Sequence, residues 1–175
     1  MNEVETIEEF YKRKFGWLPE SIRNDIGHFN VFTLEPILGD PPGPLPFRRK
    51  DYFKIMLVSG HSKVHYAHKV VEVKKQALTF SSPLMPYVWE HLDNMRQGFF
   101  CVFNENFFHQ YGNLDQYAVF QPGGTRIFEL RDDQIEPVQK IFERMMAEIN
   151  SEYAHKYDLL RTLVFELLHF AMKMV

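Results

Sequence analysis

The segment Tyr52-Phe-Lys-Ile-Met-Leu-Val58 decides the fold class of this 175-residue chain. It is rich in residues that favour strands, and it stops at Ser59-Gly60, a pair that favours a turn. Similar short stretches follow at close intervals, at residues 65–73, 76–80, 87–91 and 98–103. Short strands that are not separated by helices are typical of a sandwich or barrel. The sequence therefore predicts a mainly β chain with a barrel over residues 33–130.

The N-terminal region, residues 1–32, is predicted to form a partly helical arm ahead of this barrel. Thr6 and Glu9 have the spacing of a capping box, and apolar residues recur after them at helical intervals. Residues 30–35 then alternate as a strand would. The proline-rich run 39–46 lacks backbone donors and has fixed φ angles, so we predict a surface loop with the main sheet starting after it.

The pattern changes at Asp132, and a helical pair is predicted over residues 131–175. Apolar residues recur at alternating steps of three and four, as in a narrow seam that packs on another helix. A second helix is predicted from near Ser151, and because no glycine or proline ends it, we expect the polypeptide to continue. The seam residues are Ile135, Val138, Phe142, Met145 and Ile149, followed by Leu160, Leu163 and Leu167 in the second helix.

Composition argues against several classes of protein. The net charge is −3, whereas a domain that holds DNA by itself usually has a basic face that neutralises phosphates. Cys101, the single cysteine, stands among aromatic residues and is expected to behave as a small buried hydrophobe. The sequence has no signal peptide and no apolar stretch long enough to span a bilayer, so we predict a cytoplasmic protein without a membrane partner.

Four stretches together resemble the sensor domain of AraC-type transcription regulators. Phe47-Arg-Arg-Lys-Asp-Tyr-Phe-Lys-Ile55 resembles the opening of that cupin-like domain, and Leu78-Thr-Phe-Ser-Ser-Pro-Leu-Met-Pro-Tyr-Val-Trp-Glu90 resembles the segment that follows. Gly98-Phe-Phe-Cys-Val-Phe-Asn-Glu-Asn-Phe107 continues the similarity, and Tyr153-Ala-His-Lys-Tyr-Asp-Leu-Leu-Arg161 is similar to the helices after the barrel. The resemblance covers roughly residues 25–175, and its specificity comes from the order and spacing of these stretches.

The resemblance implies a double-stranded β-helix barrel that can hold a small effector, followed by helices that mediate homodimerisation. It also implies a C-terminal domain with two helix-turn-helix units. That domain is absent from this chain, so DNA is an expected partner only through it. The implied function is to pass effector occupancy through the helical pair to the DNA-binding domain. A barrel that binds no ligand and serves only to dimerise is an alternative, and so is packing of the seam on the barrel or on the following helix.

A metal-dependent cupin enzyme, such as a dioxygenase or isomerase, is the competing class. Such enzymes resemble this domain in fold and carry a His-x-His pair, a nearby glutamate and a later histidine. This chain offers His65, His68, Glu72 and His91. On a strand, only residues at even offsets share a face, so histidines three apart point to opposite sides. We therefore predict no metal site.

Nucleophilic catalysis is not predicted either. Cys101 has no cationic neighbour in the sequence that would lower its pKa, and Ser81-Ser82 stands before a proline without an elbow motif. Glycine-rich phosphate-binding loops are missing from the sequence. We therefore predict no catalytic residue and no cofactor.

If the barrel binds an effector, the pleat predicts which residues surround the ligand. Phe53, Ile55 and Leu57 form a wholly apolar set, whereas the other face of that strand includes Lys54, so we expect the apolar set and Leu78 to face inward. The predicted lining residues are Phe53, Ile55, Leu57, Tyr66, His68, Phe80, Trp89, Cys101 and Phe103. Rings that simply fill a small barrel are the alternative. Any effector is expected to be small and partly apolar.

Overall fold

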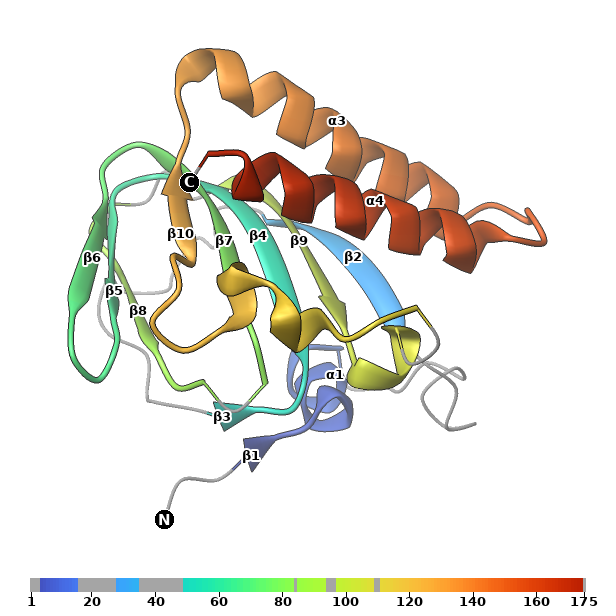
Figure 1. Cartoon of the computed structure of the whole chain (residues 1–175), viewed down its shortest axis with the longest axis horizontal. Coiled ribbons are helices and arrows are strands. Elements are labelled where there is room, and N and C mark those ends of the chain that lie inside the picture. Colours follow the sequence, from blue (N-terminus) through green and yellow to red (C-terminus); the bar gives the residue numbers. More distant parts are fainter. Residues whose placement is uncertain are drawn as a thin grey trace.

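The computed structural model describes residues 4–15, 28–34, 49–83, 85–93, 97–108 and 111–174. Two antiparallel sheets form a barrel, and two C-terminal helices lie across the outside of the larger sheet (Figure 1). This arrangement confirms the predicted fold class, which is mainly β with a cupin-like barrel followed by a helical pair.

The larger sheet has five strands in the order β10-β7-β4-β9-β2, and its neighbouring strands are antiparallel. β4 lies at its centre, and its residues from Ile55 to Val58 are all buried, which explains the continuous apolar run in the sequence. The strands are β2 (Phe29–Leu34), β4 (Phe53–Ser59), β7 (Gln76–Ser81), β9 (Gln97–Phe103) and β10 (Ile127–Glu129).

Gly98 allows β9 to lie close to β4. Its φ is +145°, and a Cβ atom built on it would lie 1.8 Å from the carbonyl oxygen of Leu57. No side chain fits at that distance, so the close approach of the two strands requires glycine.

The smaller sheet has three strands, in the order β6-β5-β8. They are β5 (Ser62–His65), β6 (Val70–Val73) and β8 (Val88–His91). The single strand predicted over residues 65–73 is therefore wrong, because a turn divides that stretch and the Tyr66 N–H donates to the Lys69 carbonyl over 2.8 Å. Folding back as a hairpin lets β5 and β6 satisfy each other's backbone groups, and neither glycine nor proline marks this turn in the sequence.

The N-terminal helix is part of the barrel core. β1 (Val4–Glu5) pairs in parallel with β3 (Arg49–Lys50), and α1 (Ile7–Phe15) follows β1. The Glu9 N–H donates to Thr6 Oγ1 over 3.1 Å, as the predicted cap requires. The predicted boundary between residues 32 and 33 falls inside β2, because that strand completes the five-stranded sheet.

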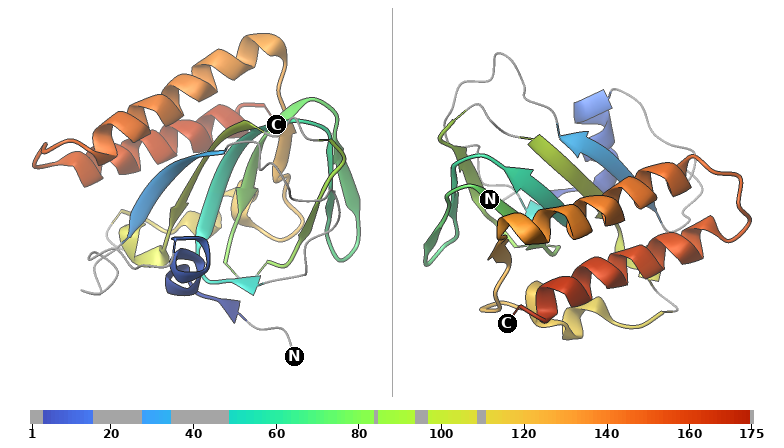
Figure 2. Two further views of the ribbon diagram at one scale, coloured as in Figure 1. Left: turned by 180° about the vertical axis from the view of Figure 1, so that it is seen from behind. Right: turned by 90° about the horizontal axis from the view of Figure 1, so that it is seen from above.

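The antiparallel helices α3 and α4 lie across the outer face of the larger sheet (Figures 1 and 2). Among the described residues, three short 3₁₀ helices also pack on the core at this face. The second helix of the pair begins at Lys156 and not near Ser151, because Lys156 Nζ donates to the carbonyls of Ile149 and Ser151 in the turn that joins the two helices. The elements are η1 (Glu105–Phe108), η2 (Leu114–Gln116), η3 (Ala118–Phe120), α3 (Asp132–Ile149) and α4 (Lys156–Met172). Among the described residues, no helix combines the length and the hydrophobicity needed to cross a bilayer.

Candidate functional site

The strands of the larger sheet contribute to two separate hydrophobic cores, one on each face. The inner core fills the barrel, and the outer core lies between the sheet and the helices. Inner-core residues include Tyr52, Met56, Val58, Val64, Val73, Ala77, Trp89, Phe100 and Val102, with Ile7, Phe10 and Tyr11 of α1. Alternate residues of β4, β7 and β9 belong to the outer core, as the period of a strand requires. The barrel interior is the candidate binding site.

Most of the predicted lining residues lie outside the barrel, so that prediction is wrong for them. The misplaced residues are Phe53, Ile55, Leu57, Cys101 and Phe103, together with Leu78, and all six belong to the outer core under the helices and 3₁₀ segments. Phe80 belongs to the same core but also borders the cavity inside the barrel, as predicted. The reason is that Lys54 does not mark a solvent-facing side of β4. Its ammonium lies 4.7 Å from the centre of the inner-core Phe100 ring, in a cation–π contact.

Two further predicted lining residues lie at the interior, and one does not. Trp89 belongs to the inner core, and Tyr66 packs against it. His68 is exposed in the turn between β5 and β6. Cys101 is fully buried, as expected of a small hydrophobe, and burial raises the pKa of its thiol.

A small cavity of about 10 Å³ remains inside the barrel, which is room for about one water molecule. Phe80 borders it, together with residues from β4, β5, β7 and β8 and their flanking turns. Its other lining residues are Lys54, Met56, Val64, Tyr66, Thr79, Ser81, Tyr87 and Trp89. No acidic side chain is among these described lining residues, and the hydroxyl, indole and ammonium groups stand beside apolar ones.

Two buried hydrogen-bond donors in this region have no partner among the described residues. One is Nε1 of Trp89, a residue that lines the cavity, and the other is Nη2 of Arg126, a residue that is only 6% exposed. Arg126 Nη1 donates to Ser82 Oγ over 3.1 Å. Burial lowers the pKa of the Arg126 guanidinium, and the nearby Tyr66 phenol raises it. Burial also raises the pKa of Tyr66 to about 12, so this phenol stays protonated and neutral at pH 7. These donors were not predicted, and no local motif marks Arg126.

The four residues weighed as metal ligands do not converge. His65 Nε2 lies 3.0 Å from Glu90 Oε1, and Glu72 pairs with His61, with 2.7 Å between Oε1 and Nε2. His68 is in the exposed turn, and His91 stands opposite Ser62 in the ladder. Within the part of the chain that the structure describes, no three histidine, cysteine or acidic side chains are grouped to hold a metal ion.

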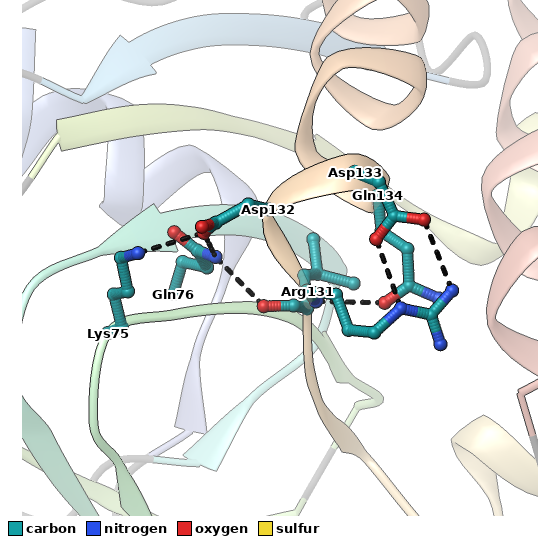
Figure 3. Close-up of polar contacts among 7 residues, drawn as sticks. Lys75, Gln76, Arg131, Asp132, Asp133 and Gln134 are labelled. Carbon is teal, nitrogen blue, oxygen red and sulfur yellow. Dashed lines mark hydrogen bonds and ion pairs between the residues drawn. The ribbon is translucent and has the colours of Figure 1, made fainter.

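The N-terminal end of α3, here called its root, is joined to β7 of the barrel by hydrogen bonds (Figure 3). Gln76 Nε2 donates to the Leu130 carbonyl over 2.8 Å and to Asp132 Oδ1 over 3.2 Å. Lys75 Nζ also donates to Asp132 Oδ1, over 2.8 Å. Beside this root, a groove of about 490 Å³ runs between α3 and the ends of β4 and β9, and its walls include Gln76, Phe99 and Ile135. The barrel and the helical pair are therefore joined by polar contacts as well as by the outer core.

The predicted dimerisation residues are mostly buried within the chain, which contradicts their use as an exposed contact. Val138, Phe142, Met145, Leu160, Leu163 and Leu167 are at most 1% exposed and form the outer core with the sheet. The Phe142 ring stacks on Phe99 of β9, with centroids 5.7 Å apart. Only Ile135 and Ile149 of the seam are partly exposed. The amphipathic seam packs on the barrel, which was the alternative explanation.

Solved structures with a similar fold include ToxT from Vibrio cholerae. No protein-family model matches the sequence, and no curated protein matches it. An apo form of a ToxT variant from Vibrio cholerae superposes with a TM-score of 0.51 at 11% identity, over 83% of this chain and 55% of that one. Wild-type ToxT with a bound unsaturated fatty acid gives 0.43 at 13% identity, over 83% and 53%.

Cupin proteins are also similar in structure, at lower scores. A predicted oxalate decarboxylase from Thermotoga maritima gives a TM-score of 0.34 at 19% identity, over 50% of this chain and 74% of that one. The chain spans about half of the length of the ToxT chain on which it superposes. The two chains share a fold over most of the present sequence, and the fold of this chain is cupin-like.

Proposed function

We propose that this chain is the effector-sensing and dimerisation domain of a cytoplasmic DNA-binding transcription regulator. The observation that carries the proposal is that β4, β7 and β9 contribute to the barrel interior on one face and to the helix contact on the other. Met56 and Phe100 face the cavity side, whereas their neighbours Leu57 and Phe99 pack towards the helices. A ligand that displaces inner residues of these strands also moves residues that hold α3 and α4.

The barrel is closed in this state, which suits a sensor with two conformers. A cavity of about 10 Å³ excludes any ligand larger than a water molecule, so binding requires a more open arrangement. α1 is the element best placed to provide it, because the Phe10 ring packs 5.5 Å from Tyr52 and 6.4 Å from Phe100. A ligand shifts such an equilibrium only by its preference for one conformer. ToxT, which shares the fold, has been solved with a fatty acid bound, and this supports ligand binding by such a barrel.

The dimer contact is proposed on the outer face of α3 and not on its buried seam. Glu136, Lys140, Glu143 and Arg144 are exposed there, and the alternating charge can complement itself across a two-fold axis. Lys140→Glu combined with Arg144→Glu should produce a monomer by light scattering at micromolar concentration, while circular dichroism shows that the chain stays folded. A wild-type chain that is monomeric under the same conditions would contradict the dimer.

The direct test of the regulator role uses the full-length protein. The coding sequence downstream of Val175 should encode helix-turn-helix units, and the full protein should bind DNA, measured by fluorescence anisotropy, when this chain alone does not. A stop codon directly after Val175 would refute the proposal. So would stoichiometric iron, manganese or zinc in the purified protein together with turnover of a substrate, since those results define a cupin enzyme.

A further inference from the structure

We infer that the effector is a small organic anion, a carboxylate with an apolar body, and that Arg126 binds its charged group. The inference rests on the proposed sensing function and names the chemical class of its ligand. It starts from one buried cation. Arg126 is only 6% exposed. Among the described residues, only the Ser82 hydroxyl accepts a hydrogen bond from its guanidinium.

A buried guanidinium without a counterion is unfavourable, because it loses hydration and gains no compensating charge. In the part of the chain that the structure describes, no carboxylate forms an ion pair with Arg126, whereas the buried Glu5 pairs with Arg13 and the largely buried Arg161 pairs with Asp158. An arginine fork offers two parallel donors that match the two oxygens of a carboxylate. Nη1 already donates one hydrogen bond, to Ser82, whereas Nη2 donates none to the described residues.

The surroundings of Arg126 extend this chemistry into the cavity. Arg126 is adjacent to the cavity wall, because the Phe80 N–H donates to the Arg126 carbonyl over 2.8 Å and Phe80 borders the cavity. Lys54 supplies a cation on the lining itself, and Nε1 of the lining residue Trp89 is a donor with no partner among the described residues. The described lining thus combines a cation, an indole donor and several hydroxyls with no acid, which favours an anion over a neutral or cationic ligand.

The rest of the lining selects an apolar body for that anion. Met56, Val64 and the Trp89 ring border the same cavity and offer no charged group. A hydrated inorganic anion would leave these surfaces uncovered, whereas a short aliphatic or aromatic carboxylate buries them. The tight cavity means that the ligand replaces inner-core contacts when it enters.

The test compares two probes of nearly equal shape, sodium hexanoate and hexanamide, on the chain as it stands. Thermal unfolding is followed by circular dichroism at constant ionic strength, with sodium chloride as the balancing salt. Hexanoate at a tenfold excess over its Kd should raise the Tm by about 3–6 °C, and hexanamide should not. Equal stabilisation by both probes, or no stabilisation specific to the carboxylate, would overturn the inference.

Two variants assign the effect to Arg126. Arg126→Met should abolish the response to hexanoate while leaving the Tm of the free protein equal or higher, because a buried charge without a partner is removed. Lys74→Met removes an exposed cation outside the described cavity lining and should keep the response. A lower Tm of free Arg126→Met with a retained response would show that the guanidinium is structural. If Arg126→Met does not fold, Lys54→Met must weaken the hexanoate response, and an unchanged response there would also overturn the inference.

Failure of this inference and failure of the proposed function are distinguishable. If a neutral probe stabilises the chain, or if DNA binding by the full-length protein responds to a neutral ligand, the regulator role stands and the anion class is wrong. If hexanoate binds through Arg126 but the gene encodes no DNA-binding domain, the ligand class stands and the regulator role is wrong.

Discussion

Truncation of Phe142 separates a core role for the α3 seam from a role in dimerisation. Phe142 is 0% exposed, and its ring stacks on Phe99 with an interplanar angle of 14°. Removing a fully buried phenylalanine ring costs about 3–5 kcal/mol through lost burial and the cavity that remains. For a chain of this size each kcal/mol lowers the Tm by about 2–4 °C, so Phe142→Ala should lose about 6–20 °C. The exposed variant Glu152→Ala, in the turn between α3 and α4, should remain within about 0.5 kcal/mol of the wild type.

The assay is thermal and urea unfolding of both variants at several protein concentrations spanning the micromolar range. A loss of packing inside one chain gives the same destabilisation at every concentration, whereas a lost subunit contact makes the Tm depend on concentration. Light scattering should find the oligomeric state of folded Phe142→Ala equal to that of the wild type. A variant that dissociates while the unfolding free energy of its monomer stays unchanged would refute the assignment of Phe142 to the outer core.

Three other perturbations address the remaining parts of the structure. Burial lowers the pKa of His28 to about 4, so as the pH falls the unfolded chain takes up a proton on this imidazole at a higher pH than the folded chain does. The unfolding free energy should therefore fall by about 3 kcal/mol from pH 6.5 to pH 4, and in urea unfolding His28→Gln should reduce this fall. Gly98→Ala should lower the Tm by several degrees more than Gly112→Ala, since both glycines have positive φ but only Gly98 would meet a carbonyl oxygen. Gln76→Ala should cost about 1–3 kcal/mol, because it leaves buried polar groups at the root of α3, whereas Lys75→Ala should have little effect on unfolding.

The strands and helices were mostly predictable because their patterns are local. The alternation at residues 30–35, the apolar run at 52–58 and the seam from residue 135 all correspond to observed elements, with β2, β4 and α3 shifted by at most a few residues. The turn at residues 66–69 was not predicted, since Ala67 and His68 carry no turn preference and pairing with a neighbouring strand decides it.

The binding site was less predictable than the fold. Trp89 and Tyr66 were placed correctly at the interior, but Arg126 was not considered, because its importance comes from burial and from a missing counterion. Neither property can be derived from the residues beside it in the sequence. Because His65 and His68 do not have the His-x-His spacing, we predicted that they form no metal site. The reason given was that they point to opposite faces of one strand, whereas in the structure His65 ends β5 and His68 lies in the turn that follows.

The sequence by itself determined that this chain forms short strands followed by two amphipathic helices, because a period of two or of three to four residues fixes which side chains share a face. Only the tertiary structure decided what each face packs against. On β4 both faces are buried, so a rule that sends the apolar face inward cannot separate the barrel interior from the contact with the helices. The wholly apolar face of β4, with Phe53, Ile55 and Leu57, packs in the outer core under the helices. The face with Lys54 points into the barrel, because the cavity there can accommodate a charged group that a close-packed helix contact cannot.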